Sequence, residues 1–235
     1  VSREASPAEV EAVRRLGLPA VAVEHRHARV YPTGRLAAHL VGYVDVDNQG
    51  LSGAERAFDD RLRGPEAGPV HLALDVGVQA AVSEELAAAL ERYQAPAGAA
   101  LVFDVRTGEI VAGASLPDFD PHHPADAPEE ARKDRLTTQS FELGSVMKLL
   151  NVAMGLATGT VGIDDRIDIA QTLRVDGLPI NDFRPKQRVV SVPEALMQSS
   201  NIANAKIALA AGAAEQRAFL DAFGLTRPVP LETGN

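Results

Sequence analysis

Residues 64–69 contain two glycines and two prolines, the densest group of chain-breaking residues in the sequence. A regular helix or a central strand does not continue through such a segment, because proline lacks a backbone N–H and glycine favours turns. We therefore place a domain boundary there, between residues 1–69 and 70–235. For the first part the pattern predicts a helix over 7–16 and strands over 20–24 and 28–31.

The second part alternates helical and strand patterns. Apolar residues recur every four positions from Val78 to Leu90, which predicts a helix over 78–93. Strand patterns over 99–105 and 109–114 flank a Thr-Gly turn and are typical of a hairpin. The remaining predicted elements are strands over 70–74, 166–169 and 173–180, and helices over 145–157, 192–197, 202–211 and 215–223. The predicted fold class is therefore α+β.

Composition narrows the possible chemistry. Apolar residues make up 46% of the 235 positions, enough for a sizeable core, and the net charge of −9 argues against nucleic acid as a partner. The chain has no cysteine, so a nucleophile must be an oxygen or a nitrogen. His122 and His123 lack further ligands at metal spacing, so we expect a solvated loop and no metal site there. No stretch reaches the roughly 18 apolar residues of a membrane span.

The most reactive local pattern is Ser145-Val146-Met147-Lys148, directly after Gly144 and at the start of a predicted helix. Residues three apart share a helix face, so the hydroxyl and the amine project together. A lysine with a lowered pKa can take the proton of a serine, whereas an arginine cannot. A Ser-x-x-Lys pair also arises by chance. This pattern alone therefore does not decide between a catalytic pair and a chance pairing.

A second polar cluster, Ser199-Ser200-Asn201, lies between two predicted helices. The Ser199 hydroxyl could relay a proton to or from Lys148, and the Asn201 amide could bind a peptide carbonyl. Serine and asparagine are also favoured N-caps, and the following helix needs one. Both interpretations stay open from the residues alone.

Together the two clusters resemble the Ser-x-x-Lys and Ser-x-Asn motifs of the penicillin-recognising serine transferases. Further blocks resemble class B penicillin-binding proteins, and among these the septal cell-division transpeptidases. The likeness spans residues 29 to about 225. The blocks are Arg29-Val30-Tyr31-Pro32, Gly50-Leu51-Ser52-Gly53-Ala54-Glu55, Asp75-x-x-Val78-Gln79 and Asp104-Val105-x-Thr107-Gly108-Glu109.

The resemblance implies a non-catalytic pedestal over residues 1–69 and the first part of a transpeptidase domain, with helices around an antiparallel sheet, over 70–235. It implies that Ser145 attacks a peptidoglycan stem peptide, with Lys148 as base, Ser199 moving protons and Asn201 holding the donor. β-Lactams would acylate Ser145, and no metal or organic cofactor is implied. The implied setting is the periplasmic face of the cell membrane, beside a glycan polymerase and division proteins, with an N-terminal anchor outside this sequence.

One family motif has no counterpart here, because no Lys-Thr/Ser-Gly occurs in the sequence. Glu232-Thr233-Gly234 has the wrong charge for a carboxylate-binding position and lies too soon after Ser199, so we expect a loop. We therefore expect the transpeptidase domain to be truncated before that strand, and residues 1–235 alone to react slowly with penicillin. Two alternatives remain, a scaffolding module of the division machinery and a D-alanine carboxypeptidase or β-lactam hydrolase.

Overall fold

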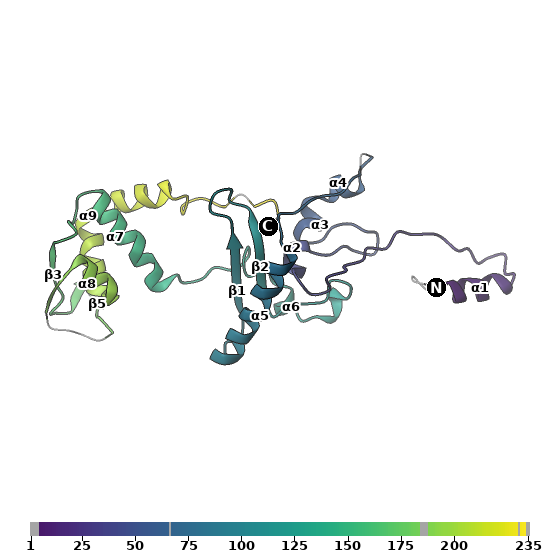
Figure 1. The fold of residues 1–235 in the computed structure, drawn as a ribbon, viewed down its shortest axis with the longest axis horizontal. Helices are drawn as coiled ribbons and strands as arrows, with labels where there is room; N and C mark the ends of the chain where they lie inside the picture. Colours follow the sequence, from purple (N-terminus) through teal and green to yellow (C-terminus); the bar gives the residue numbers. More distant parts are fainter. Residues whose placement is uncertain (1–4, 66, 184–187, 230, 234–235) are drawn as a thin grey trace. The chain divides into compact units, whose positions relative to one another are not determined.

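The computed structural model describes residues 5–65, 67–183, 188–229 and 231–233. These form two compact units, residues 5–139 with 232–233, and residues 140–231. Figure 1 traces the chain through both units. The elements are helices and short antiparallel strands, which confirms the α+β class. No helix of the described residues is both long and apolar enough to cross a membrane.

The N-terminal part of the first unit is built from short helices. Helix α1 (Pro7–Arg15) confirms the first prediction, and its start is fixed by a reciprocal Ser6–Glu9 capping box. Three further helices follow: α2 (Ala38–Val41), α3 (Gly53–Ala57) and α4 (Asp59–Arg63).

The strands predicted over 20–24 and 28–31 are wrong, because both described segments are irregular. Several of their side chains stay exposed, Val21 by 49% and Val30 by 67%, whereas Tyr31 is buried without forming a strand. The strand predicted over 70–74 is also wrong, since that described segment is irregular up to the Asp75 N-cap of the next helix. Alternation marks a strand only where another strand pairs with it.

One helix of the first unit packs on a β-hairpin (Figure 1). Helix α5 (Val76–Tyr93) and the antiparallel strands β1 (Gly98–Phe103) and β2 (Ile110–Leu116) confirm the predicted helix and hairpin. The buried Gln79 of α5 donates to Gly113 O and accepts from Gly113 N, both at 2.9 Å. This amide therefore fastens α5 to β2.

The segment after β2 packs against the N-terminal helices. It contains the 3₁₀ turn η1 (Pro124–Asp126) and helix α6 (Glu129–Arg132). Phe119 is fully buried, with the rings of His39 and Tyr43 edge-on at 5.1 and 5.5 Å between centroids. His122 accepts a 3.1 Å hydrogen bond from Tyr31 N. Residues 31–43 and 119–122 therefore share one core.

The described residues of the second unit form three α-helices and two small sheets. Turn η2 (Gly144–Val146) leads into α7 (Met147–Ala157), and β3 (Arg166–Asp168) pairs with β6 (Val189–Ser191). The other elements are β4 (Leu173–Val175) paired with β5 (Leu178–Ile180), α8 (Val192–Met197) and α9 (Asn201–Ala222). Gly212 has φ +84° and interrupts α9, which accounts for the two separately predicted helices.

Two apolar clusters hold these helices together. Val152, Val192 and Ile207 join α7, α8 and α9. A second cluster packs α8 and the first turn of α9 against the β3–β6 sheet. It consists of Ile169, Val190, Ala195, Ile202 and Ala203. α7 and α9 approach closely at Gly155, where a Cβ atom would lie 2.7 Å from Ile207 Cγ2. The start of α7 and the start of α9 are thereby fixed on one rigid body.

Candidate active site

Ser145 and Lys148 lie where η2 becomes α7. Gly144 has φ +56°, a conformation that glycine adopts without strain, and Ser145 follows in the 3₁₀ turn. Lys148 is the second residue of α7 and is partly buried, whereas Ser145 is exposed. The turn thus presents an exposed hydroxyl one helical turn before the amine.

Ser199 is the middle residue of the three-residue link, residues 198–200, between α8 and α9. Its φ is +53°, the left-handed region that non-glycine residues seldom adopt. Ser199 N donates to Leu196 O and Ser200 N donates to Ala195 O, both at 2.9 Å, so the end of α8 holds the link. The N-cap of α9 is Ser200, whose Oγ accepts from Ala203 N. Because Ser200 takes the capping role, the side chains of Ser199 and Asn201 are available for other contacts.

The four predicted site residues meet at the Lys148 amine. Nζ donates to Ser199 O at 2.6 Å, to Ser199 Oγ at 2.9 Å and to Asn201 Oδ1 at 2.6 Å. Ser199 Oγ in turn donates to Ser145 Oγ at 2.8 Å. Within the described residues, Ser145 reaches Lys148 through the Ser199 hydroxyl. The structure thus brings the predicted residues together, and their catalytic roles stay predictions.

The surroundings of Lys148 shift the pKa of its amine downwards. Burial lowers the pKa of the Lys148 amine, and the Asp182 carboxylate partly opposes this effect. The neighbours that bind Nζ are uncharged. Only the neutral amine can accept a proton, and a lowered pKa increases the share of that form at a given pH.

A second layer of polar groups orients the site. Asn201 Nδ2 donates to Asn181 O at 2.8 Å, which turns its Oδ1 atom towards Lys148. Asp182 accepts from Ser200 Oγ and from Ile202 N. No sequence pattern points to Asn181 or Asp182, because they lie in a loop 18 or more residues before Ser199 or Ser200. Only the tertiary fold brings them to the helix junction.

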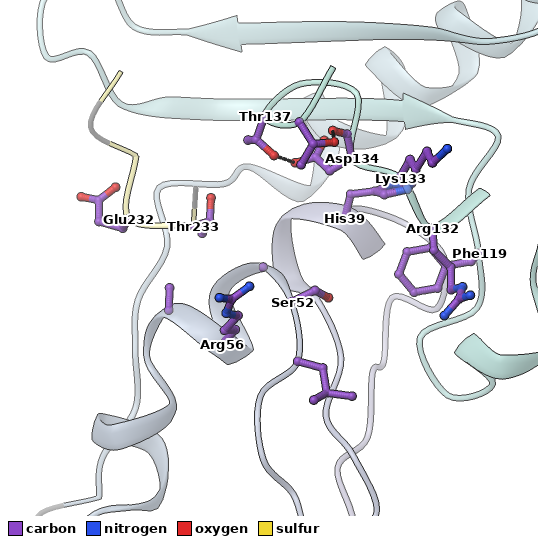
Figure 2. Close-up of a pocket in the computed structure, with 14 residues that line it drawn as sticks. His39, Ser52, Arg56, Phe119, Arg132, Lys133, Asp134, Thr137, Glu232 and Thr233 are labelled. Carbon is purple, nitrogen blue, oxygen red and sulfur yellow. Dashed lines mark hydrogen bonds between the residues drawn. The ribbon is translucent and has the colours of Figure 1, made fainter. Parts of the chain in front are cut away.

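The cavity in Figure 2 belongs to the other unit. Its volume is about 380 Å³, and it contains none of the four predicted residues. Glu232 and Thr233 line this cavity and lie in a turn, in agreement with the loop predicted for the segment. Gly234 lies outside the described residues. No cluster of three metal-binding side chains occurs among the described residues.

Comparison with known families gives two matches that together cover most of the chain. Residues 98–233 match the penicillin binding protein transpeptidase domain, and residues 1–85 match the penicillin-binding protein dimerisation domain. The chain belongs to the penicillin-binding protein transpeptidase family. The four site residues lie within the transpeptidase match, and the boundary near residue 69 stays a prediction.

Individual members of the penicillin-binding protein family are similar over nearly the whole chain. The "Probable peptidoglycan D,D-transpeptidase FtsI" of Caulobacter vibrioides is 38% identical over 97% of this chain and 39% of its own length. The peptidoglycan D,D-transpeptidase FtsI of Escherichia coli K12 is 29% identical over 98% of this chain and 43% of its own. The chain therefore spans about two fifths of the length of these relatives.

A solved structure shares the fold. It is the D,D-transpeptidase domain of a peptidoglycan glycosyltransferase from Eggerthella lenta, with a TM-score of 0.76 and 27% identity. The likeness covers 87% of this chain and 49% of that one.

Proposed function

We propose that this chain carries the acyl-transfer site of a septal peptidoglycan D,D-transpeptidase. The observation that carries the proposal is the continuous hydrogen-bonded path from Ser145 Oγ through Ser199 Oγ to Lys148 Nζ. A serine becomes a nucleophile when a positioned base accepts its proton. The names of the relatives support the choice of reaction.

The hydrogen-bond count around Lys148 suits a proton relay. A protonated amine has three N–H donors, and three acceptors surround Nζ. When the amine is neutral, two N–H groups still serve Ser199 O and Asn201 Oδ1. Its lone pair then accepts from Ser199 Oγ, which itself accepts from Ser145 Oγ. Reversing the hydroxyl directions therefore prepares Ser145 for attack without moving a heavy atom.

In the proposed reaction, Ser145 Oγ forms a bond to the penultimate D-Ala carbonyl carbon of a stem peptide. The hydroxyl proton passes through Ser199 Oγ to Lys148 Nζ. The C–N bond then breaks, and the terminal D-Ala departs with that proton, which leaves an ester on Ser145. The amine of a second stem peptide attacks the ester carbonyl, the C–O bond to Ser145 breaks, and one proton of that amine returns to Ser145 Oγ, so that a cross-link forms.

The same site would react with β-lactams, since their strained amide presents a comparable carbonyl to Ser145. The proposal includes a setting at the periplasmic face of the cell membrane. It also includes a glycan polymerase and division proteins as partners, as the resemblance to class B penicillin-binding proteins implies. No metal or organic cofactor takes part in any proposed step.

Labelling with a fluorescent penicillin tests the proposal in the protein as its gene encodes it. We expect one stable adduct on Ser145, found by peptide mass spectrometry, and no adduct in Ser145→Ala. Ser140→Ala is the matched control, because Ser140 is also an exposed serine of the same unit. An adduct that persists in Ser145→Ala would refute the assignment. A stem-peptide donor supplied with a D-amino acid acceptor should give the exchanged peptide, and hydrolysis alone would indicate a carboxypeptidase.

A further inference from the structure

Asp182 contacts the helix junction at two points. Its carboxylate accepts from Ser200 Oγ, at 3.1 Å to Oδ1 and 2.9 Å to Oδ2, and from Ile202 N at 3.0 Å. Ser200 is only 1% exposed. A buried hydroxyl and the first turn of α9 are thus tied to a single carboxylate from the loop after β5.

These contacts fix the residue next to Ser199. Ser200 is also held through its carbonyl, which accepts from Asn204 Nδ2 at 2.9 Å, and through its N–H, which donates to Ala195 O. With Ser200 fixed, the left-handed Ser199 is confined between α8 and α9. This conformation directs both Ser199 O and Ser199 Oγ at Lys148.

We propose that Asp182 is a positioning residue for acyl transfer: its carboxylate fixes the turn that presents Ser199 to Lys148 and Ser145. The inference rests on the proposed function, because it assigns how the proposed relay is held in place. Asp182 contacts neither the reacting hydroxyl nor the amine by hydrogen bond in the described structure, so it acts through Ser199.

The Asp182 carboxylate also acts on Lys148 through its charge. The charge raises the pKa of Lys148, against the larger lowering by burial. Two other charged groups of the helices packed against α7 have different partners. Glu194 of α8 binds Ser191 N, and Lys206 of α9 binds Asp168 O. Glu215, Arg217 and Asp221 lie beyond the Gly212 interruption of α9.

Three variants separate position from charge. Asp182→Asn keeps the shape and removes the charge. Ser200→Ala removes the hydroxyl contact and keeps the charge. Asp176→Asn is the control, since it removes the same charge from an exposed turn between β4 and β5, where asparagine tolerates the φ of +50°. The measurement is the rate of acylation by a fluorescent penicillin from pH 5 to 10, in the protein as its gene encodes it.

In the unmodified protein the rate should rise with pH as Lys148 loses its proton, and then level off. Asp182→Asn should move this rise to lower pH, because Lys148 loses a group that raises its pKa. It should also lower the plateau by about 10- to 100-fold, because a displacement of about 1 Å at a reacting group costs up to about 10²-fold. Ser200→Ala should lower the plateau and leave the rise in place. Asp176→Asn should change neither.

A plateau unchanged by both Asp182→Asn and Ser200→Ala would overturn the inference. If Asp182→Asn lowered the acylation rate by the same factor at every pH and did not move the pH at which the rate rises, Asp182 would be merely structural. That result would also overturn the inference. Circular dichroism of each variant checks folding, and Ser200→Ala keeps the test decisive if Asp182→Asn does not fold. Failure of the proposed function looks different, because the unmodified protein would then form no adduct on Ser145.

Discussion

Replacing Gln79 with leucine should destabilise the α5–β2 contact severely, although no reacting group is touched. Gln79 is 2% exposed, and its amide makes two 2.9 Å hydrogen bonds to the buried backbone of Gly113. Leucine has a similar volume and no polar atom. The substitution therefore removes both hydrogen bonds with little change in packing volume.

The expected loss is about 3 kcal/mol in the free energy of unfolding. A buried N–H or C=O group left without a partner costs about 1–3 kcal/mol, and Gly113 would have one of each. The added apolar surface of leucine offsets about 1 kcal/mol. Ser83→Ala is the matched control, since it removes only the 3.3 Å contact from Gln79 Nε2 to Ser83 Oγ and should cost less than about 1 kcal/mol.

Gln79→Glu adds a test through pH. A glutamate there can accept from Gly113 N, but only its protonated form can donate to Gly113 O. The pKa of that carboxyl should therefore rise on folding, so the variant should be most stable at low pH and lose stability as the pH rises through the raised pKa.

Urea unfolding followed by circular dichroism gives the free energies, and hydrogen exchange of the Gly113 amide reports the contact itself. We expect Gly113 to exchange faster in Gln79→Leu than in Ser83→Ala. The reasoning fails if Gln79→Leu unfolds within about 0.5 kcal/mol of the unmodified protein and Gly113 keeps its protection.

Two further predictions concern the second unit. Lys148→Arg should fold, by circular dichroism, but lose about 10²- to 10⁴-fold in penicillin acylation, because a guanidinium cannot accept the serine proton; near-normal labelling would exclude Lys148 as the base. Ser191→Ala removes the capping box of α8 and should cost about 1 kcal/mol of stability. Ser6→Ala breaks the equivalent box of α1, which buries no residue, and should leave the overall unfolding free energy nearly unchanged; equal losses would contradict this.

Elements with strong local periodicity could be predicted from the sequence. Helix α5, the β1–β2 hairpin and helix α7 each carry their pattern within a few neighbouring residues. Residues 20–24 and 28–31 show strand-like alternation but pair with no strand of the described residues, and no local pattern in the sequence shows that a partner strand is missing. Strand β6 has only three residues, and it depends on pairing with β3.

The residues of the site also divide into those that sequence spacing predicts and those that only the tertiary fold brings together. Ser145 and Lys148 are three residues apart on one turn and could be paired by spacing alone. Asp182 could not, because its contacts to Ser200 and Ile202 depend on how the β4–β5 hairpin and its following loop reach α9. Neither the charge of Asp182 nor its neighbours in sequence distinguishes it from the exposed Asp176.

The two adjacent serines show most clearly what backbone geometry adds to residue type. Ser199 and Ser200 have identical side chains, and either could serve as a cap or as a proton relay. The left-handed φ of Ser199 costs on the order of 1–2 kcal/mol, which the hydrogen bonds of Ser200 and the end of α8 can offset. Because the backbone is left-handed at Ser199, Ser199 Oγ lies between Lys148 and Ser145. Ser200 Oγ instead turns inward to Asp182. The motif supplies two hydroxyls, and the left-handed backbone of Ser199 decides which of them contacts both Lys148 and Ser145.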